Sequence, residues 1–98
     1  MKSVLAKATA LSNANRLPIL EVLDKPELHF GPGYYDDEEG VCGLYISEKL
    51  GISAPTASAH LKVLVQAGFL ESVRIGKFTY FKRIPLAMQA FAEELRSL

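Results

Sequence analysis

The short connection between two helical segments most constrains how this chain folds. Residues 41–50 and 54–66 are predicted helices, and only Gly51-Ile52-Ser53 separates them. The glycine readily takes the conformation that ends a helix, and the serine is a good N-cap for the next one. Pro55 fits the first turn of the second helix, where its missing N–H needs no partner. The pattern predicts two helices joined by a tight turn.

Two strand-like segments follow this helix pair. Residues 69–74 and 78–83 are rich in β-branched and aromatic side chains, and Ile75-Gly76-Lys77 lies between them. Such runs around a glycine-containing turn are typical of a β-hairpin. We therefore expect residues 41–66 to form a helix-turn-helix, with a hairpin wing over residues 69–83.

Helical patterns also flank this central unit. Residues 1–11 carry apolar residues at helical spacing, and Ser12 or Asn13 is suited to cap a second helix. Pro18 conflicts with a cap at Asn13, so that helix either bends or starts later. The last helix opens at Pro85 and carries a narrow apolar seam suited to a partner helix. The members of the seam are Met88, Phe91, Leu95 and Leu98.

The segment between the second and third helices is a predicted long acidic surface loop. Residues 24–40 combine turn formers with six acidic side chains. His29 and the acids at 36–39 offer ligands for a cation, although an acidic run is usually solvated. The loop's aromatic side chains either pin it to the body or line an effector pocket. They are Phe30, Tyr34 and Tyr35.

Charge separates along the chain. Lys plus Arg and Asp plus Glu each number 11, so the net charge is zero, which by itself argues against a polyanion partner. Residues 49–83 nevertheless hold six basic residues against Glu71 alone, whereas residues 1–48 hold four basic and eight acidic residues. Residues 84–98 hold one basic and two acidic residues. A basic middle segment favours a polyanion-binding face, with a solvated basic surface as the alternative.

Length, hydropathy and cysteine content lead us to expect that the chain does not belong to several classes of protein. A chain of 98 residues suits one domain, here residues 1–98. It has neither an apolar run near the roughly 20 residues of a membrane span nor the pattern of a signal peptide. Its single cysteine, Cys42, fits a reducing, cytoplasmic setting without disulfides. Because it has no nucleophile–base pair, phosphate loop or metal motif, we expect no enzyme and no cofactor.

The second helix of the pair has a slim polar face suited to double-stranded DNA. Its inward stripe is Ala57, Leu61 and Leu64, and its outward residues are Pro55, Ala59, Lys62 and Gln66. Small side chains permit approach to a major groove about 12 Å wide, and basic side chains of the hairpin suit phosphates. We expect Thr56, Ser58 and Ala59 to face bases. The predicted backbone contacts are Ser53, His60, Lys62, Arg74 and Lys77, with packing at the helix-turn-helix edge as the alternative for His60.

Three segments resemble the ArsR family, the arsenic-repressor-like bacterial transcriptional regulators. They are residues 10–20, 46–70 and 74–81. The resemblance implies a mainly α-helical (α+β) winged helix-turn-helix with five helices and a β-hairpin wing. It also implies a homodimer built from the first and last helices (residues 1–11 and 85–98) that binds an inverted repeat and represses until an unknown effector releases it. The predicted dimer contacts are Leu5, Met88, Phe91 and Leu95.

The chain departs from the metal-sensing members of that family. Those that sense arsenic carry a Cys-x-Cys pair near the third helix, where this chain has Val41-Cys42-Gly43-Leu44. Zinc-sensing members carry His and Asp on the last helix, and residues 86–98 contain neither. The resemblance thus implies DNA binding without a metal site. Two alternatives remain: a protein-interaction module without DNA binding, and a redox-responsive repressor using Cys42, whose thiol otherwise is a buried, inert group.

Overall fold

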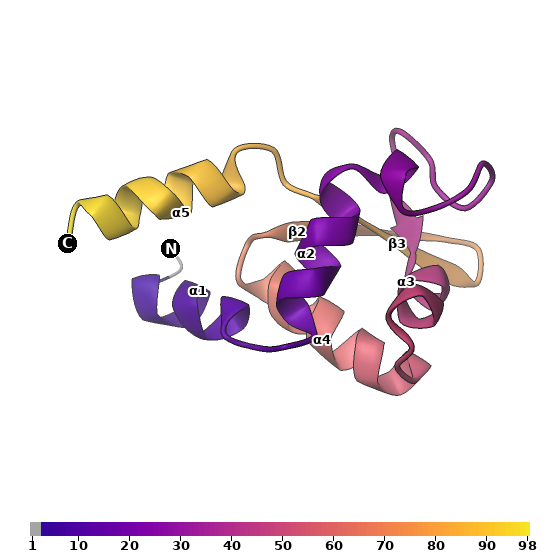
Figure 1. Cartoon of the computed structure of the whole chain (residues 1–98), viewed down its shortest axis with the longest axis horizontal. Coiled ribbons are helices and arrows are strands. Elements are labelled where there is room, and N and C mark those ends of the chain that lie inside the picture. The colour runs from indigo at the N-terminus through magenta and orange to yellow at the C-terminus, as the bar shows by residue number, and fades with distance from the viewer. Residues whose placement is uncertain (1–2) are drawn as a thin grey trace.

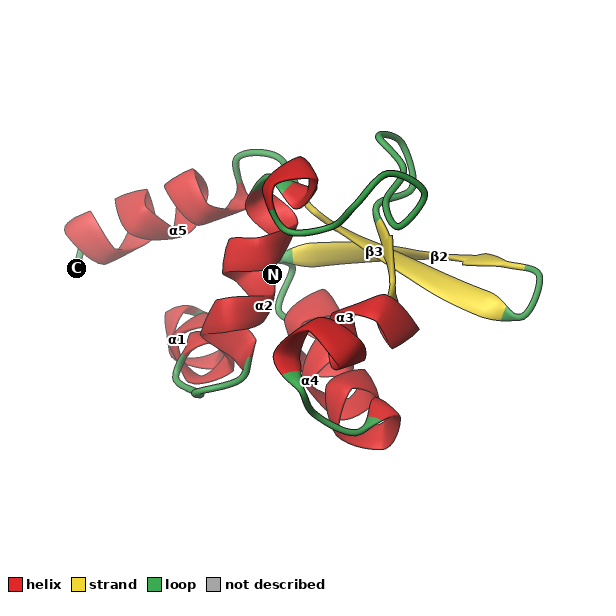
Figure 2. Ribbon diagram, turned by 45° about the vertical axis from the view of Figure 1, so that its right-hand side comes forward, coloured by secondary structure: helices red, strands yellow, loops and turns green. Residues whose placement is uncertain are grey.

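The computed structural model describes residues 3–98, which form five α-helices, one 3₁₀ turn and three antiparallel strands (Figures 1 and 2). The expected winged helix-turn-helix fold is confirmed. In chain order the elements are α1 (Val4–Leu11), α2 (Arg16–Asp24), η1 (Pro26–Leu28), β1 (Val41–Cys42), α3 (Gly43–Leu50), α4 (Ala54–Gln66), β2 (Leu70–Ile75), β3 (Phe78–Arg83) and α5 (Ala87–Arg96). Helices α1 and α5 lie at one end of the long axis and the hairpin tip at the other (Figure 1).

The core lies between α2, the α3–α4 pair and the inner end of the sheet. Its largest fully buried side chains are Ile19, Val41, Ile46, Leu61, Leu64 and Leu70. Phe91 extends this core to α5, because its ring meets Phe69 edge-on at a centroid distance of 5.8 Å. Ala10 does the same for α1. Buried contacts thereby attach both terminal helices to the helix-turn-helix and the wing.

The turn between α3 and α4 has the predicted chemistry. Gly51 lies in the left-handed region, with φ 67°, and ends α3. The N–H of Ile52 donates to the carbonyl of Ser47, which closes the turn. The Ser53 Oγ accepts from the N–H of Thr56 and caps α4. These local bonds fix the angle at which α4 leaves α3.

The start of α2 resolves the conflict over Pro18. The Oδ1 of Asn13 accepts the N–H groups of Asn15 and Arg16 at 2.8 and 3.2 Å, and α2 begins at Arg16. Pro18 therefore falls in the first turn, where its missing N–H leaves no bond unmade. Of the two possibilities, the later start is correct.

Two helix boundaries predicted from the sequence are wrong. Val41 and Cys42 form a strand rather than the start of α3, since they pair with Phe81 and Tyr80 of β3. The sheet order is β1-β3-β2, so the hairpin gains a third strand. The last helix starts at Ala87 rather than Pro85, because the chain first turns through Leu86, whose φ is 67°.

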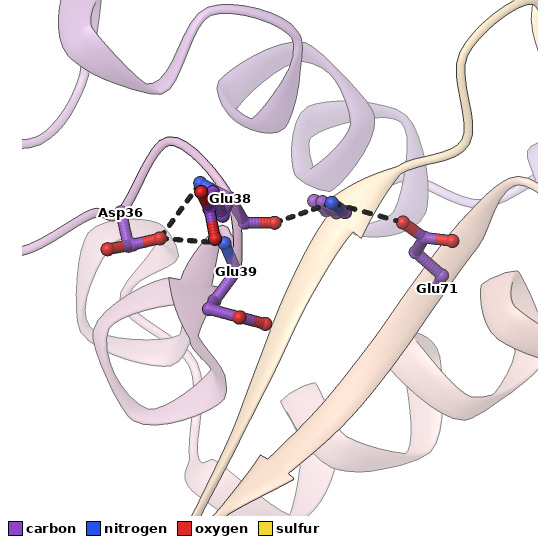
Figure 3. A network of polar contacts seen from close by, with 5 residues as sticks. Asp36, Glu38, Glu39 and Glu71 are labelled. Atoms are coloured by element: carbon purple, nitrogen blue, oxygen red, sulfur yellow. Dashed lines mark hydrogen bonds and ion pairs between the residues drawn. The ribbon is translucent and has the colours of Figure 1, made fainter.

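The acidic loop is ordered by its own side chains and by the body. The Asp36 Oδ1 accepts the N–H groups of Glu39 and Glu38, each at 2.8 Å (Figure 3). These bonds favour the charged carboxylate and hold the pKa of Asp36 below its ordinary value. Phe30 is buried in the core, and the ring of Tyr34 packs edge-on against a second tyrosine in α3, at 4.7 Å. Both aromatic residues therefore pin the loop.

Candidate nucleic-acid interface

Helix α4 presents one buried stripe and one exposed polar face. Ala57, Leu61 and Leu64 are buried against the protein, as their spacing predicts. The exposed residues of the opposite face are Pro55, Thr56, Ser58, Ala59, Lys62 and Gln66. Most of these side chains are short, so the first half of α4 is slim enough to enter a major groove about 12 Å wide.

The N-terminus of α4 holds two hydroxyl groups in a fixed arrangement. The Ser53 Oγ donates to the Oγ1 of Thr56 at 2.8 Å while it accepts that residue's N–H at 3.2 Å. The Thr56 hydroxyl keeps its own proton for a further partner, and its methyl group is fixed beside it. This arrangement presents a donor and an apolar contact at the exposed start of the helix.

The tip of the wing carries exposed positive charge. Arg74 lies near the end of β2 and Lys77 lies in the turn between β2 and β3, and both are exposed. The Arg74 Nε donates to the carbonyl of Gly76 at 3.1 Å, which holds the guanidinium beside the turn. Two cations at the end of a projecting hairpin are well placed to contact phosphates (Figure 2).

The basic residues at the base of the wing differ from those at its tip. Lys82 lies 3.3 Å from the carboxylate of Glu71 and donates to the carbonyl of Glu38 (Figure 3). Arg83 lies 3.6 Å from the carboxylate of Asp24. Because these charges are paired with acids, Arg74 and Lys77 at the tip are the hairpin cations that have no acidic partner within residues 3–98.

His60 faces the body of the protein. Its ring is half-buried, with Nδ1 3.1 Å from the Arg16 Nη1 and Nε2 3.3 Å from the Asn15 amide. Since a guanidinium only donates, Nδ1 accepts the hydrogen bond from Arg16. Both ring nitrogens thus face α2 and its cap, which favours packing of His60 at the helix-turn-helix edge over the predicted phosphate contact. The partners of the ring are side chains rather than backbone groups.

Arg16 links α1 to α4, and the sequence did not reveal this role. It donates from Nε to the carbonyl of Ala10 at 2.6 Å and from Nη2 to that of Thr9 at 3.3 Å. It therefore joins the end of α1 to α4 through His60. No local pattern signals this role, because the partners lie 6 to 44 positions away in the chain.

The cation and redox candidates gain no support from the geometry. Within residues 3–98, no group of three or more His, Cys, Asp or Glu side chains is arranged to hold a metal ion. One carboxylate oxygen of Asp36 accepts two backbone N–H groups within its own turn. Cys42 is buried and is the one cysteine of the chain. A redox role for it stays a prediction.

The terminal helices expose part of the predicted dimer seam. Leu5 of α1 and Leu95 of α5 are 76% and 46% exposed, and Met88 is half-buried. Phe91 is only 4% exposed, because it packs against Phe69 of its own chain. The side chain at this predicted dimer contact is therefore buried within its own chain. An ion pair between Lys7 and Glu94 also joins the two helices.

Comparisons with known proteins agree with this architecture. Residues 38–72 match the profile described as bacterial regulatory protein, arsR family. An uncharacterized HTH-type transcriptional regulator of Bacillus subtilis strain 168, YbzH, is 42% identical over 90 residues, which span 90% of each chain. The chain belongs to the ArsR family. It is a helix-turn-helix transcriptional regulator that binds DNA, and this is a family of regulators rather than enzymes.

Solved structures share the fold of this ArsR-family chain. A possible transcriptional regulatory protein of Mycobacterium bovis (fragment 1–100) superimposes with a TM-score of 0.70 at 26% identity, covering 96% of this chain and 88% of that one. The homodimeric winged helix-turn-helix DNA-binding domain Mb0332 of the same organism gives 0.68 at 25% identity, covering 96% and 76%. An ArsR-like regulator from Rhodococcus sp. RHA1 gives 0.69 at 21%, covering 96% and 76%, and shares the fold.

Across residues 3–98, every helix is too short or too polar to cross a lipid bilayer.

Proposed function

We propose that this chain is a homodimeric, cytoplasmic repressor that binds an inverted-repeat operator through α4 and the tip of the wing. One observation carries the proposal: α4 exposes a slim polar face beside Arg74 and Lys77, while the other hairpin cations are paired with acids. A helix of this shape suits the major groove, and the cations suit the phosphates on either side.

The side chains of α4 divide into two roles. Thr56, Ser58 and Ala59 face the bases, and the phosphates are held by Ser53, Lys62, Arg74 and Lys77. His60 positions α4 from behind through Arg16. Because short side chains make few bidentate contacts with bases, much of the specificity comes from thymine methyl groups and DNA shape.

The dimer places two copies of α4 and the wing, one from each protomer, on one duplex. The exposed leucines Leu5 and Leu95 supply apolar surface at the end of the molecule away from the wing. The described homodimer of the related M. bovis domain supports the same assembly here. A symmetric dimer reads an inverted repeat, since each copy meets the same half-site in the opposite direction.

Footprinting of fragments selected from the source genome tests the reading mode. We expect a protected inverted repeat with A/T-rich half-sites and contacts to thymine methyl groups. Protection of a G/C-rich core that is read through guanines would contradict the assignment of Thr56, Ser58 and Ala59 to the bases.

Replacing Lys77 with alanine tests the wing. Loss of one phosphate contact lowers the slope of log K against log salt by about 1 and weakens binding equally on operator and random duplex. Fluorescence anisotropy over a salt series measures both slopes, and Lys25→Ala, at an exposed lysine of the acidic loop, is the control. An unchanged slope would show that Lys77 of the wing makes no contact with a DNA phosphate. Absence of any salt-dependent binding by the unaltered chain would favour a protein-interaction module instead.

A further inference from the structure

A cavity of about 310 Å³ lies between the two elements that we assign to DNA. Its walls come from the start of α3, the first half of α4 and the wing. Ser58 and Lys77, both proposed DNA contacts, line it together. Whatever fills this cavity touches the recognition helix and the wing at once.

The walls are mainly apolar. Leu44, Leu61, Phe78 and Phe81 supply most of the large side chains. Leu44 and Phe78 remain 43% and 48% exposed although they flank the cavity, so apolar surface there is still open to water. Covering it with a ligand is favourable by the hydrophobic effect. A volume near the lower end of ordinary ligand sites limits the occupant to a small molecule.

One lining residue carries a full charge. Lys77 is among the lining residues, and no Asp or Glu is. A mainly apolar cavity with a single lysine in its lining is complementary to a small molecule that has an apolar body and one anionic group. A cationic ligand is disfavoured by the same charge.

We propose that this cavity binds a small aromatic carboxylate, whose ring lies among Leu44, Phe78 and Phe81 and whose carboxylate pairs with Lys77. The effect on DNA rests on the function proposed above. The Lys77 ammonium then has two competing partners, the ligand carboxylate and a DNA phosphate. Binding of either one weakens the other by the same factor, so such acids are effectors that release the repressor.

Titration of the full-length ¹⁵N-labelled chain with 3-phenylpropionate, in the absence of DNA, tests the site. We expect saturable shifts of the amide signals of Gly43, Ser58, Phe78 and Thr79, with a dissociation constant on the order of millimolar for so small a ligand. The uncharged 3-phenylpropionamide binds about two- to fivefold more weakly, because an exposed ion pair contributes modestly. Absence of saturable shifts would overturn the site, and equal binding of the amide would overturn the ligand class.

Two variants separate the apolar and charged parts. Phe78→Ser removes an exposed wall and abolishes binding of 3-phenylpropionate, whereas Lys77→Ala removes the preference for the acid over the amide. Unchanged signals from α2 and α5 verify that both variants are folded. Acid binding by Phe78→Ser at the original strength, or an intact acid preference in Lys77→Ala, would overturn the assignment of that residue.

A separate experiment measures the link to DNA. Addition of 3-phenylpropionate lowers the anisotropy of a labelled operator bound to the protein, and acetate, which lacks the ring, does not. Binding of the acid without release of DNA would overturn the effector role. Failure of the chain to bind any operator would instead refute the proposed function, and the DNA-free titration would still decide the site.

Discussion

Replacing Phe91 with alanine destabilises the folded protein severely. The ring is buried and packs against Phe69, where it attaches α5 to the body. Truncation of a buried phenylalanine costs about 3–5 kcal/mol, which is a large part of the 5–15 kcal/mol that typically stabilises a domain. Urea denaturation followed by circular dichroism measures the loss. Leu95→Ala is the matched control on the same helix, and we expect a far smaller change in its single-protomer stability.

The same helix allows the dimer to be tested without loss of the fold. Leu95→Glu places a charge on the exposed seam, so we expect a folded monomer by sedimentation and loss of tight operator binding. Gln89→Glu adds the same charge at another exposed position of α5 and leaves the dimer intact. A Leu95→Glu protein that remains dimeric would place the interface elsewhere. A Phe91→Ala protein of unchanged stability would contradict the buried contact with Phe69.

Gly40→Ala is the second substitution with a large expected effect. Gly40 has φ 93°, and an added Cβ would lie 2.0 Å from the carbonyl oxygen of Phe81. That oxygen belongs to the backbone of β3, so relief of the clash requires β1 and β3 to separate. Strain at positive φ alone costs about 1–3 kcal/mol, and the clash adds to it. We expect a fall in the free energy of unfolding of more than about 3 kcal/mol.

Gly33→Ala separates the two contributions to this cost. Gly33 has a similar φ of 89°, but no atom lies within 4 Å of the added Cβ. This variant therefore reports the backbone strain alone, which we expect to be about 1–3 kcal/mol. Equal losses of stability in the two variants, measured by the same denaturation experiment, would show that the approach of Gly40 to β3 is not as close as described.

The parts of the fold that the sequence predicted have local causes. Gly51 and Ser53 act on residues within one turn of themselves, so the end of α3 and the start of α4 follow from their chemistry. The hairpin is equally local, because its strands are neighbours in the chain. The outward face of α4 follows from helical geometry once the buried stripe is recognised.

The features that the sequence missed depend on distant partners. β1 is two residues long and is a strand because β3, about 40 positions later, pairs with it. Phe91 matches a dimer seam by spacing, but Phe69 takes its ring into the protomer's own core. His60 appears on the flank of the recognition helix, and only the folded chain brings Arg16 to it. In each case the local sequence pattern fitted two structural interpretations, and a contact with a residue distant in the chain favours one of them.

The contacts of Arg16 have a consequence for the operator. One guanidinium bonds to two carbonyls at the end of α1 and to the ring of His60 on α4. In the proposed homodimer α1 lies at the subunit junction, so this side chain fixes the rotation of each reading helix relative to the two-fold axis. The geometry of the protein dimer then sets the distance between the two half-sites that it can bind. An operator lengthened by a single base pair turns one half-site out of phase by about 34–36°, and the protein must either twist the DNA or release one half-site.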